Sequence, residues 1–409
     1  MIKIIGNILL FLKILLKVAF KYLSEIFKQQ TKKPVLETVM KEKEKTIFVF
    51  ITTHLFDGLK QRPHHIALNI ANRFQVFYFC PIFMKDWEQQ KVTSPISMKK
   101  IDRNLTVYEI ALFGGENISF FRSINRLIME LAIKSETGKN NASVLWLYDP
   151  RFEDLSSKFP NAKIVYDIMD EHTGFAWSPK DITERESKLL KKADVVFAGT
   201  KALYDSKKKG VKNIHFYSCG VDFKHFNEIP TMPFEIEKET SNWKGKILGY
   251  FGTVDMRIDQ DLIEFIAKRH PEFTIVLLGP VIGDFSRFQD YDNIVLTGTI
   301  VYEKLSYYMS KFDVSIIPFV LNELTLHINP TKILEYFAGC KPVVSIAIPD
   351  VIEFYGDTVF ISKDKEEFEK NLILALDTSK TKERIIVELE KAKAYSWESV
   401  VNSMLSKVI

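Results

Sequence analysis

The sequence predicts an α/β protein built from two doubly wound domains that face a cleft. The chain has 409 residues, which is enough for two or three domains of ordinary size. Short apolar runs recur along it without strict alternation, as in strands buried on both faces of a parallel sheet. Amphipathic stretches with helical spacing separate these runs, as the right-handed crossovers of such a sheet require. Together these observations predict two Rossmann-like sheets with helices on both faces.

Composition narrows the class of protein. Hydrophobic residues make up 46% of the chain and charged residues 26%, which excludes a disordered tail, a collagen-like fibre and a multi-span membrane protein. The formal net charge is +4, from 56 basic and 52 acidic residues. Residues 1–28 hold five lysines and one acid, Glu25, so they carry the whole excess. Because the rest of the chain is balanced, a nucleic-acid-binding surface across the body is disfavoured.

The cysteines indicate the compartment. Cys80, Cys219 and Cys340 lie far apart in sequence and form no C-x-x-C pair, so a zinc site has no support. A sparse, odd number of cysteines is typical of a reducing compartment, and we expect the protein in the cytoplasm.

The N-terminal segment, residues 1–28, is strongly apolar but interrupted by charges. Its longest uncharged run, Ile4–Leu12, is too short to span a bilayer, which takes about 20 residues. Lys13, Lys17 and Lys21 recur at i, i+4 and i+8, so they line one face of an otherwise apolar helix. This pattern predicts an amphipathic helix on an anionic membrane surface, peripheral on the inner face of the cell membrane. Docking on the protein's own core or on a partner, and a true span, are the alternatives.

The first α/β domain is predicted over residues 46–230, after a charged linker at residues 29–45. Pro63 lies where a first helical turn begins, and apolar residues follow it at helical spacing. Helices are also expected over 120–136, 181–192 and 201–209. Runs rich in β-branched and aromatic residues predict strands at 47–51, 76–82, 105–110, 144–148, 163–169, 194–199 and 213–218.

The second α/β domain is predicted over residues 246–380. It follows residues 228–245, which contain two prolines and no steady period and read as an interdomain linker. Strands are expected at 246–252, 273–279, 293–298, 314–319, 342–347 and 358–362. Helices are expected from about residue 260 and over 303–311 and 331–338, and residues 381–409 are predicted to be helical.

Ligands of doubly wound sheets bind beyond the carboxyl ends of the strands, which directs attention to the turn after 246–252. Gly249 and Gly252 flank two aromatic residues there, and the turn enters a helix. A glycine at such a point lets backbone N–H groups approach a phosphate. Arg257 lies within the turn and can pair with a diphosphate through two hydrogen bonds. The structural alternative is a glycine turn with a surface arginine.

A second informative stretch spans residues 318–344. Asn329, Pro330 and Thr331 open a helix there. Lys332 and Glu335 are three residues apart, so they share one face of it. A cation near the helix start can hold a phosphate, and a carboxylate one turn later can accept two hydroxyls of a ribose or hexose. An exposed Lys–Glu pair of little energetic value is the alternative.

These segments resemble the GT-B glycosyltransferases of the family 4 type. The resemblance rests on GYFGTVD and PTKILEYFAGCKPVV in the second domain, and on KKADVVFAGTKAL and SCGVDFKHF upstream. QRPHHIA and YDIMDE resemble a bacterial branch that builds cell-wall and capsular polysaccharides. The resemblance covers most of residues 46–409. It implies a nucleotide-diphosphate sugar as donor, and a C-terminal helix, residues 381–409, that crosses back to the first domain.

The resemblance also implies roles for individual donor-side residues. Glu335 would hold the ribose of the donor nucleotide, and Arg257 and Lys332 would neutralise its diphosphate. The family's E-x7-E pair requires a glutamate at position 327, where this chain has His327, and Glu323 is off spacing. Asn329 or Thr331 is therefore expected to contribute on the sugar side. This departure leaves open whether the anomeric centre is retained or inverted.

Two residues are candidates for the catalytic group on the acceptor side. The family often has a histidine after the strand that matches 163–169, and this chain reads Met169-Asp170-Glu171-His172 there. Asp170 is the first candidate and His172 the second. A helix cap or turn cap is the alternative role for Asp170.

The sequence thus predicts a glycosyltransferase that moves a hexose-type sugar to a lipid-linked or polysaccharide acceptor in surface glycan biosynthesis. Neither a metal nor another cofactor is expected, since the two D-x-D spacings, Asp259–Asp261 and Asp290–Asp292, fall at a helix start and in a loop. A catalytically silent paralogue that binds a glycan or partner at the membrane is the first alternative. A sugar-nucleotide epimerase on the same architecture is the second.

Overall fold

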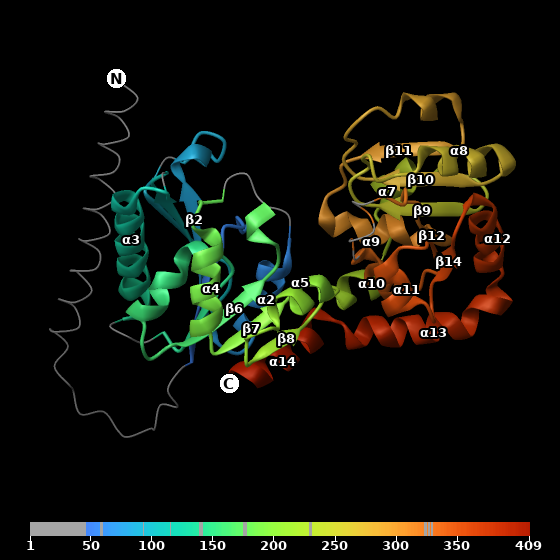
Figure 1. The fold of residues 1–409 in the computed structure, drawn as a ribbon. Helices are drawn as coiled ribbons and strands as arrows, with labels where there is room; N and C mark the ends of the chain where they lie inside the picture. Colours follow the sequence, from blue (N-terminus) through green and yellow to red (C-terminus); the bar gives the residue numbers. More distant parts are fainter. Residues whose placement is uncertain are drawn as a thin grey trace, which may run out of the picture. The chain divides into compact units, whose positions relative to one another are not determined.

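The computed structural model describes residues 46–409 except 58–59, 93, 115, 139–141, 175–177, 229–230, 323–324, 326–327 and 329 (Figure 1). The predicted membrane-surface helix, residues 1–28, and the linker over 29–45 lie outside the described residues. The chain divides into two compact units: unit 1 combines the residues up to Ser218 with Val401–Ile409, and unit 2 runs from Cys219 to Val400. Within the described part, no helix combines the length and hydropathy needed to cross a bilayer.

Unit 1 is built on one sheet, whose described strands follow the order β3-β4-β2-β1-β5-β6-β7-β8. Neighbouring strands are parallel except for the edge pair β3–β4. Because β1 pairs with both β2 and β5, the direction of winding reverses between β1 and β5. The strands are β1 Ile47–Ile51, β2 Gln75–Phe83, β3 Ile96–Lys100, β4 Leu105–Leu112, β5 Val144–Leu147, β6 Lys163–Ile168, β7 Val195–Ala198 and β8 Ile214–Phe216.

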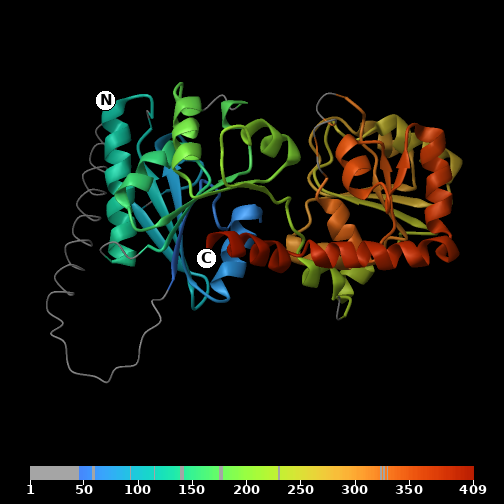
Figure 2. The same cartoon turned by 60° about the horizontal axis from the view of Figure 1, so that its bottom comes forward.

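Helices cover both faces of this sheet. Figure 2 shows α4 on one side of the strands and α2 on the other. Most residues of the central strands are fully buried, as strands covered on both faces must be. The helices are α2 Arg62–Ala71, η1 Met84–Asp86, α3 Ser119–Thr137, η2 Pro150–Lys158, η3 His172–Gly174, α4 Ile182–Lys192, α5 Lys201–Lys207 and the later part of α14 Trp397–Val408.

Arg62 joins several elements of unit 1. Its side chain is buried and its Nε lies 2.9 and 3.1 Å from the two carboxylate oxygens of Asp167 in β6. Nη1 donates to the carbonyls of Tyr217 and Ser218, and Nη2 approaches the sulfur of Met404 in α14 at 3.8 Å. One guanidinium therefore connects α2, β6, the segment that leaves unit 1 and the helix that re-enters it.

Unit 2 contains a second sheet, with described strands in the order β11-β10-β9-β12-β13-β14, all parallel. β9 pairs with both β10 and β12, so the winding reverses between β9 and β12. The strands are β9 Ile247–Phe251, β10 Thr274–Leu278, β11 Ile294–Gly298, β12 Val314–Ile317, β13 Val343–Ile346 and β14 Phe360–Ser362.

The helices of unit 2 pack around this sheet, and Figure 1 shows α8 and α12 beside it. Asp259 and Asp364 accept backbone N–H bonds at the starts of α8 and α12, which explains where these helices begin. The helices are α6 Phe223–Asn227, α7 Phe234–Glu239, α8 Gln260–Arg269, η4 Ser286–Asp290, α9 Tyr302–Ser310, α10 Lys332–Ala338, α11 Pro349–Tyr355, α12 Lys365–Leu376, α13 Thr378–Ala394 and the first residues of α14.

The units divide at 218/219, whereas the sequence places a linker over residues 228–245. The difference has a physical cause in α6 and α7, which belong to unit 2. Phe226 of α6 stacks on Phe251 of β9 at 5.9 Å, and Ile236 of α7 is fully buried. Pro233, one of the two prolines that suggest a linker, instead directly precedes the first residue of α7.

Candidate active site

The candidate site in unit 2 lies where the winding of the sheet reverses, at the carboxyl ends of β9 and β12. Loops diverge at such a point and leave room for a ligand. The turn after β9 carries Gly252 and Arg257, and α10 carries Lys332 and Glu335. The structure thus brings together, in one unit, four of the six residues that the sequence suggests for donor binding.

Gly252 and Lys332 are in close contact. Gly252 has φ +135°, in the region that favours glycine. A Cβ there would lie 2.9 Å from the Tyr250 hydroxyl and 3.0 Å from Cε of Lys332. The Lys332 ammonium lies over the rings of Tyr250 and Phe319, 5.5 and 5.8 Å from their centroids. The missing side chain of Gly252 therefore leaves the space that the lysine occupies.

Neighbouring groups shift the pKa of Lys332 in opposite directions. Burial and the nearby Arg257 lower the pKa of Lys332 to about 8, although the Glu335 and Asp255 carboxylates oppose this shift. Burial raises the pKa of Glu335 to about 7, helped by Asp222 and opposed by Lys332. Both groups therefore titrate close to neutral pH, which is typical of residues in functional sites.

Arg257 is held by a carboxylate that sequence reasoning did not single out. Its Nε and Nη2 donate to the two oxygens of Asp255 at 2.8 and 2.7 Å, and its backbone N–H donates to the same side chain at 3.0 Å. The guanidinium also lies 5.7 Å from the centroid of Phe319. Asp255 is the last residue of the GYFGTVD stretch, so the motif includes this residue but does not indicate that it pairs with Arg257.

Glu335 interacts electrostatically with Asp222 and Tyr302, which belong to other elements of unit 2. Burial raises the pKa of Tyr302, and the carboxylates of Glu335 and Asp222 add to this shift. The His225 ring stacks on Tyr302 at 4.6 Å, and Asp222 accepts a hydrogen bond from the His225 backbone. A surface pocket of about 600 Å³ adjoins this group and is lined by Asp222, Lys224, His225, Glu228, Glu303, Ser306 and Tyr307.

The remaining donor-side candidates are placed only in part. Thr331 is exposed, immediately before α10, and its side chain makes no capping bond to this helix. Asn329 lies outside the described residues, as do His327 and Glu323. The proposed sugar-side roles of Asn329 and Thr331 therefore stay predictions.

The acceptor-side candidates lie in unit 1, beyond the carboxyl end of β6. Asp170 is exposed, whereas His172 is buried and its Nε2 lies 3.1 Å from the Tyr148 carbonyl. The pKa of His54, which follows β1, is lowered by burial and raised by Asp170 and Asp149. Two carboxylates and two histidines thus interact across the ends of β1, β5 and β6. His54 and Asp149 were not suggested by the sequence, because each stands outside any recognisable motif.

A smaller pocket of about 230 Å³ lies near the same sheet edge of unit 1. The Arg151 guanidinium lies 4.3 Å from the centroid of the Phe83 ring, and Asp149 holds it through both carboxylate oxygens. Its lining combines a ring face with polar groups, which suits a sugar-containing ligand. The lining residues are Thr53, Leu55, Pro81, Ile82, Phe83, Lys85, Asp86, Gln90 and Arg151.

The histidine of the QRPHH stretch that lies in the core has a structural task. The Gln61 backbone N–H donates to Nδ1 of His64 at 2.9 Å, and Nε2 lies 3.0 Å from the Leu55 carbonyl. Burial lowers the pKa of His64 to about 4, so its ring is neutral at physiological pH. With Arg62 committed to Asp167, this stretch stabilises the fold rather than carrying chemistry.

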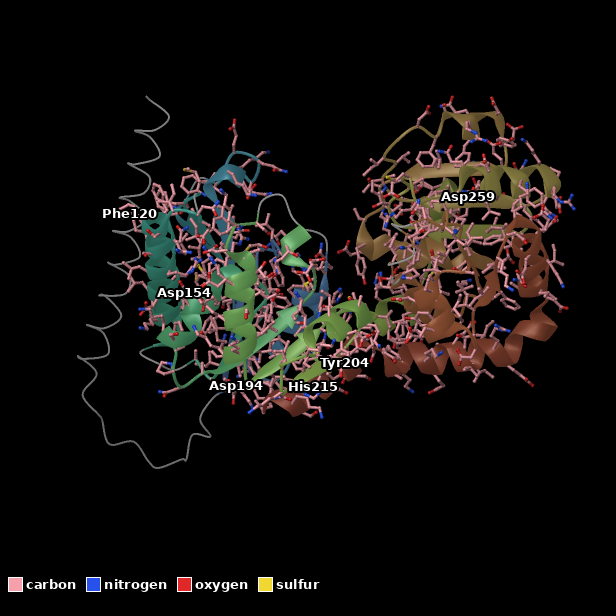
Figure 3. The ribbon with its side chains drawn as sticks, in the orientation of Figure 1. Phe120, Asp154, Asp194, Tyr204, His215 and Asp259 are labelled. Carbon is pink, nitrogen blue, oxygen red and sulfur yellow. The ribbon has the colours of Figure 1, made fainter. Side chains whose placement is uncertain are left out.

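The two aspartates of the first D-x-D spacing make ordinary structural contacts. Asp259, labelled in Figure 3, accepts a hydrogen bond from the Leu262 N–H at the start of α8. Asp261 pairs with Arg287 at 2.8 Å on the surface. Across the described residues, no group of three His, Cys, Asp or Glu side chains is arranged to hold a metal ion.

Comparison with known proteins places this geometry in context. No family model matches the chain. The chain is 25% identical over 346 residues to the Bacillus subtilis (strain 168) protein named "Putative teichuronic acid biosynthesis glycosyltransferase TuaH", covering 78% of this chain and 86% of the relative.

Solved structures resemble the chain at the level of the fold. A sucrose-phosphate synthase from Thermosynechococcus elongatus matches with a TM-score of 0.63 at 14% identity, covering 88% of this chain and 98% of the other. An α,α-trehalose-phosphate synthase (UDP-forming) from Burkholderia xenovorans matches with a TM-score of 0.60 at 11% identity, covering 89% and 99%. The chain has the two parallel-sheet, Rossmann-like domains of the GT-B fold. Membership of family 4 stays a prediction.

Proposed function

We propose that the chain is a glycosyltransferase that moves a hexose-type sugar from a nucleotide-diphosphate sugar to a lipid-linked or polysaccharide acceptor in surface glycan biosynthesis. The observation that carries this proposal is the cluster of Arg257, Lys332 and Glu335 at the point where the sheet of unit 2 reverses its winding. The GT-B fold and the similarity to a relative named for teichuronic acid biosynthesis support it.

The donor-side residues match the charge that develops during glycosyl transfer. As the glycosidic bond to the diphosphate breaks, negative charge grows on the leaving group and positive charge on the sugar. Lys332 and Arg257 supply the cations that stabilise the diphosphate. In this proposal the turn at Gly252 lets its backbone approach a phosphate, and Glu335, one helical turn after Lys332, accepts hydroxyls of the ribose.

Asp255 has a part in this arrangement. Its carboxylate holds Arg257 in a fixed orientation through two hydrogen bonds. A donor diphosphate then meets a guanidinium whose conformational freedom is already restricted, which lowers the entropy cost of binding.

On the acceptor side, Asp170 is the first candidate for the group that takes the proton of the attacking hydroxyl, and His172 is the second. Asp170 is exposed and can meet a substrate, whereas His172 is buried and hydrogen-bonded to the backbone. His54 and Asp149 act on the same region, and we assign them to orientation and charge balance.

The acceptor and the location belong together in this proposal. The lysines of residues 1–28 attract an anionic membrane surface, and peripheral attachment on the inner face of the cell membrane places the enzyme beside a lipid-linked acceptor. No metal or other cofactor is required for the roles assigned here.

A screen of nucleotide sugars with the purified full chain and a lipid-linked oligosaccharide acceptor tests the proposal. Sugar transfer is expected, and Lys332→Met and Glu335→Gln should each lower kcat/KM by about 10²–10³-fold. Lys370→Met and Glu366→Gln, the same changes at exposed positions of α12, should leave it unchanged. No turnover with any donor would contradict the proposal and favour the silent paralogue. Epimerised free nucleotide sugar in the absence of acceptor would favour the epimerase.

A further inference from the structure

The outer face of α3 carries an apolar stripe. Phe120, Ile124, Leu127 and Leu131 follow one another at intervals of four, three and four residues, so they line one side of the helix. The side chains of Phe120 and Leu127 are 64% and 45% exposed, and those of Ile124 and Leu131 are half-buried. Ile118, next to the start of α3, is also 51% exposed.

This stripe is distinct from the face that α3 uses to pack on unit 1. The buried face carries Ile128, Met129, Ala132 and Ile133 and lies against β4 and η2. Figures 1 and 2 show α3 at the side of the sheet of unit 1, and Figure 3 shows Phe120 at its N-terminal end. A helix with two apolar faces presents one of them for a second contact, since contiguous exposed apolar surface marks an interaction site.

The sequence contains a segment with the matching pattern. Within residues 1–28, apolar residues recur at alternating intervals of four and three, which is the spacing of helix-on-helix packing. They are Ile5, Leu9, Leu12, Leu16, Ala19, Leu23 and Ile26. On a helix, Lys13, Lys17 and Lys21 line a different face from this row. The segment can therefore pack against an apolar stripe and keep its lysines in water.

The start of the described chain lies near α3. The Ile47 carbonyl accepts a hydrogen bond from the Ser143 N–H at 2.9 Å, and Ser143 follows the end of α3 at Thr137 by only six residues. Residues 29–45 form a 17-residue connection, with an expected end-to-end distance of about 20–25 Å. The stripe from Phe120 to Leu131 is about 17 Å long. The connection thus lets residues 1–28 reach the whole stripe.

We propose that residues 1–28 dock as a helix along the Phe120–Leu131 stripe of α3 in the same chain. Phe11, Leu15, Val18 and Tyr22, also at intervals of four, three and four, form a second row that this docking leaves uncovered. That row and the lysine face both stay outside the contact with α3 and are available to an anionic membrane surface. The segment then fixes unit 1 to the membrane in one orientation instead of tethering it through a loose connection. The proposal does not depend on the sugar-transfer activity.

Disulfide trapping in the full chain tests the docking. In a Cys219→Ser, Cys340→Ser background, Leu16→Cys is combined with Leu127→Cys at the centre of the stripe. Mild oxidation is expected to give an intramolecular disulfide, identified by peptide mapping of the monomer. Leu16→Cys with Lys188→Cys, on exposed α4, serves as the matched control and should give little of it. Alkylation of the reduced proteins shows that the introduced thiols are reactive.

Three results would overturn the proposal. Disulfide-linked dimers alone would mean that a second copy occupies the stripe. Absence of the disulfide with reactive thiols would mean that the segment does not dock there. Failure of the disulfide to form when vesicles of phosphatidylglycerol and phosphatidylcholine are added before oxidation, with the protein bound to them, would mean that the bilayer takes the apolar row instead. Phe120→Lys and Ile124→Lys, added together to the variant that carries Leu16→Cys and Leu127→Cys, provide a second test. They should lower the yield of the disulfide between positions 16 and 127 at least several-fold while unit 1 stays folded.

Discussion

Lys332 carries its charge in surroundings that disfavour it. Burial and the neighbouring Arg257 lower its pKa to about 8, and the carboxylates nearby only partly compensate. Such a lysine gains from an added anion, because a diphosphate adds negative charge to what the nearby carboxylates supply. The residue is thus poised to bind a phosphate and not merely to pair with Glu335.

The lowered pKa of Lys332 predicts a pH limit on nucleotide binding. The ammonium is lost as the pH rises through about 8, so affinity for UDP or GDP should fall above this pH, by up to about tenfold per unit. Titration calorimetry between pH 6.5 and 9.5 measures this. Lys332→Arg, whose guanidinium stays charged, should bind with little pH dependence above about pH 8, where Glu335 is already ionised. An unchanged profile in the arginine variant would contradict the assignment.

Gly252→Ala should weaken donor binding through Lys332. The new Cβ would crowd the Tyr250 hydroxyl and Cε of Lys332, in addition to straining a backbone with φ +135°. Gly210→Ala is the control, because Gly210 also has positive φ but has nothing within 4 Å of the added carbon. Both variants should lose about 1–2 kcal/mol of stability from the backbone. Only Gly252→Ala should raise the Kd for the nucleotide, by about tenfold or more. Equal nucleotide affinity in the two variants would refute the contact.

Some residues of the candidate site could be predicted from the sequence and others could not, and the difference has a physical reason. Gly252, Arg257, Lys332 and Glu335 stand in short motifs at strand ends, where the rules of doubly wound sheets direct attention. The pairing of Asp255 with Arg257 depends on the backbone path of one turn, and the Phe319 ring comes from a different strand end. His54 and Asp149 likewise meet only through the strand order of unit 1. Such juxtapositions arise from tertiary structure and leave no spacing in the sequence.

At the scale of elements, a buried ion pair holds unit 1 together. Arg62 of α2 and Asp167 of β6 are both inaccessible to solvent, and burial raises the pKa of Asp167 even though Arg62 opposes the shift. A buried pair contributes little when compared with a well-packed apolar pair, but removing one partner leaves an unpaired charge in the core. Removing one partner therefore costs more free energy of unfolding than the intact pair contributes.

Arg62→Ala should destabilise unit 1 by about 3–5 kcal/mol, which urea unfolding followed by circular dichroism measures. Lys99→Ala removes one partner of the exposed Lys99–Asp57 pair and should cost less than about 1 kcal/mol. The double variant Arg62→Met, Asp167→Leu should be more stable than Arg62→Ala, because it leaves no unpaired charge. A small loss in Arg62→Ala would show that water or rearrangement satisfies Asp167.

The helices and strands that the sequence predicts differ in burial and length from those that it does not predict. Central strands such as β1 and β9 lie within a residue of the predicted ranges, because continuous apolar runs mark strands covered on both faces. Edge strand β3 was not predicted, since Ile96–Lys100 is mostly exposed and polar and depends on pairing with β4. Short helices α6 and α7 were missed because they are too brief to show a period.

At the scale of the whole molecule, the predicted fold class is confirmed, since two parallel-sheet units match GT-B structures over nearly the full chain. Alternation of strands and helices sufficed for this result, because right-handed crossovers allow few topologies. The acceptor, the sugar and the role of residues 1–28 stay predictions, since they depend on molecules or segments outside the described structure.

Deleting residues 1–28 should abolish binding to anionic vesicles, because these residues carry the whole net charge of +4. Co-sedimentation with phosphatidylglycerol vesicles at low salt measures this, and high salt should weaken binding of the full chain. Replacing Lys13, Lys17 and Lys21 with glutamine is a milder variant that should lower binding at least tenfold. Transfer to a soluble acceptor should persist in the deletion variant. Unaltered vesicle binding after the deletion would exclude the membrane role.

The composition of unit 1 has a consequence for the order of synthesis. Residues 401–409 complete unit 1, yet they follow all of unit 2 in the sequence. On the ribosome, unit 2 can therefore fold from a continuous stretch while unit 1, whose first strand emerges earliest, still lacks the residues that contact Arg62 and Arg73. The domain that is made first is thus finished last, and its unfilled surface is what chaperones would meet during translation.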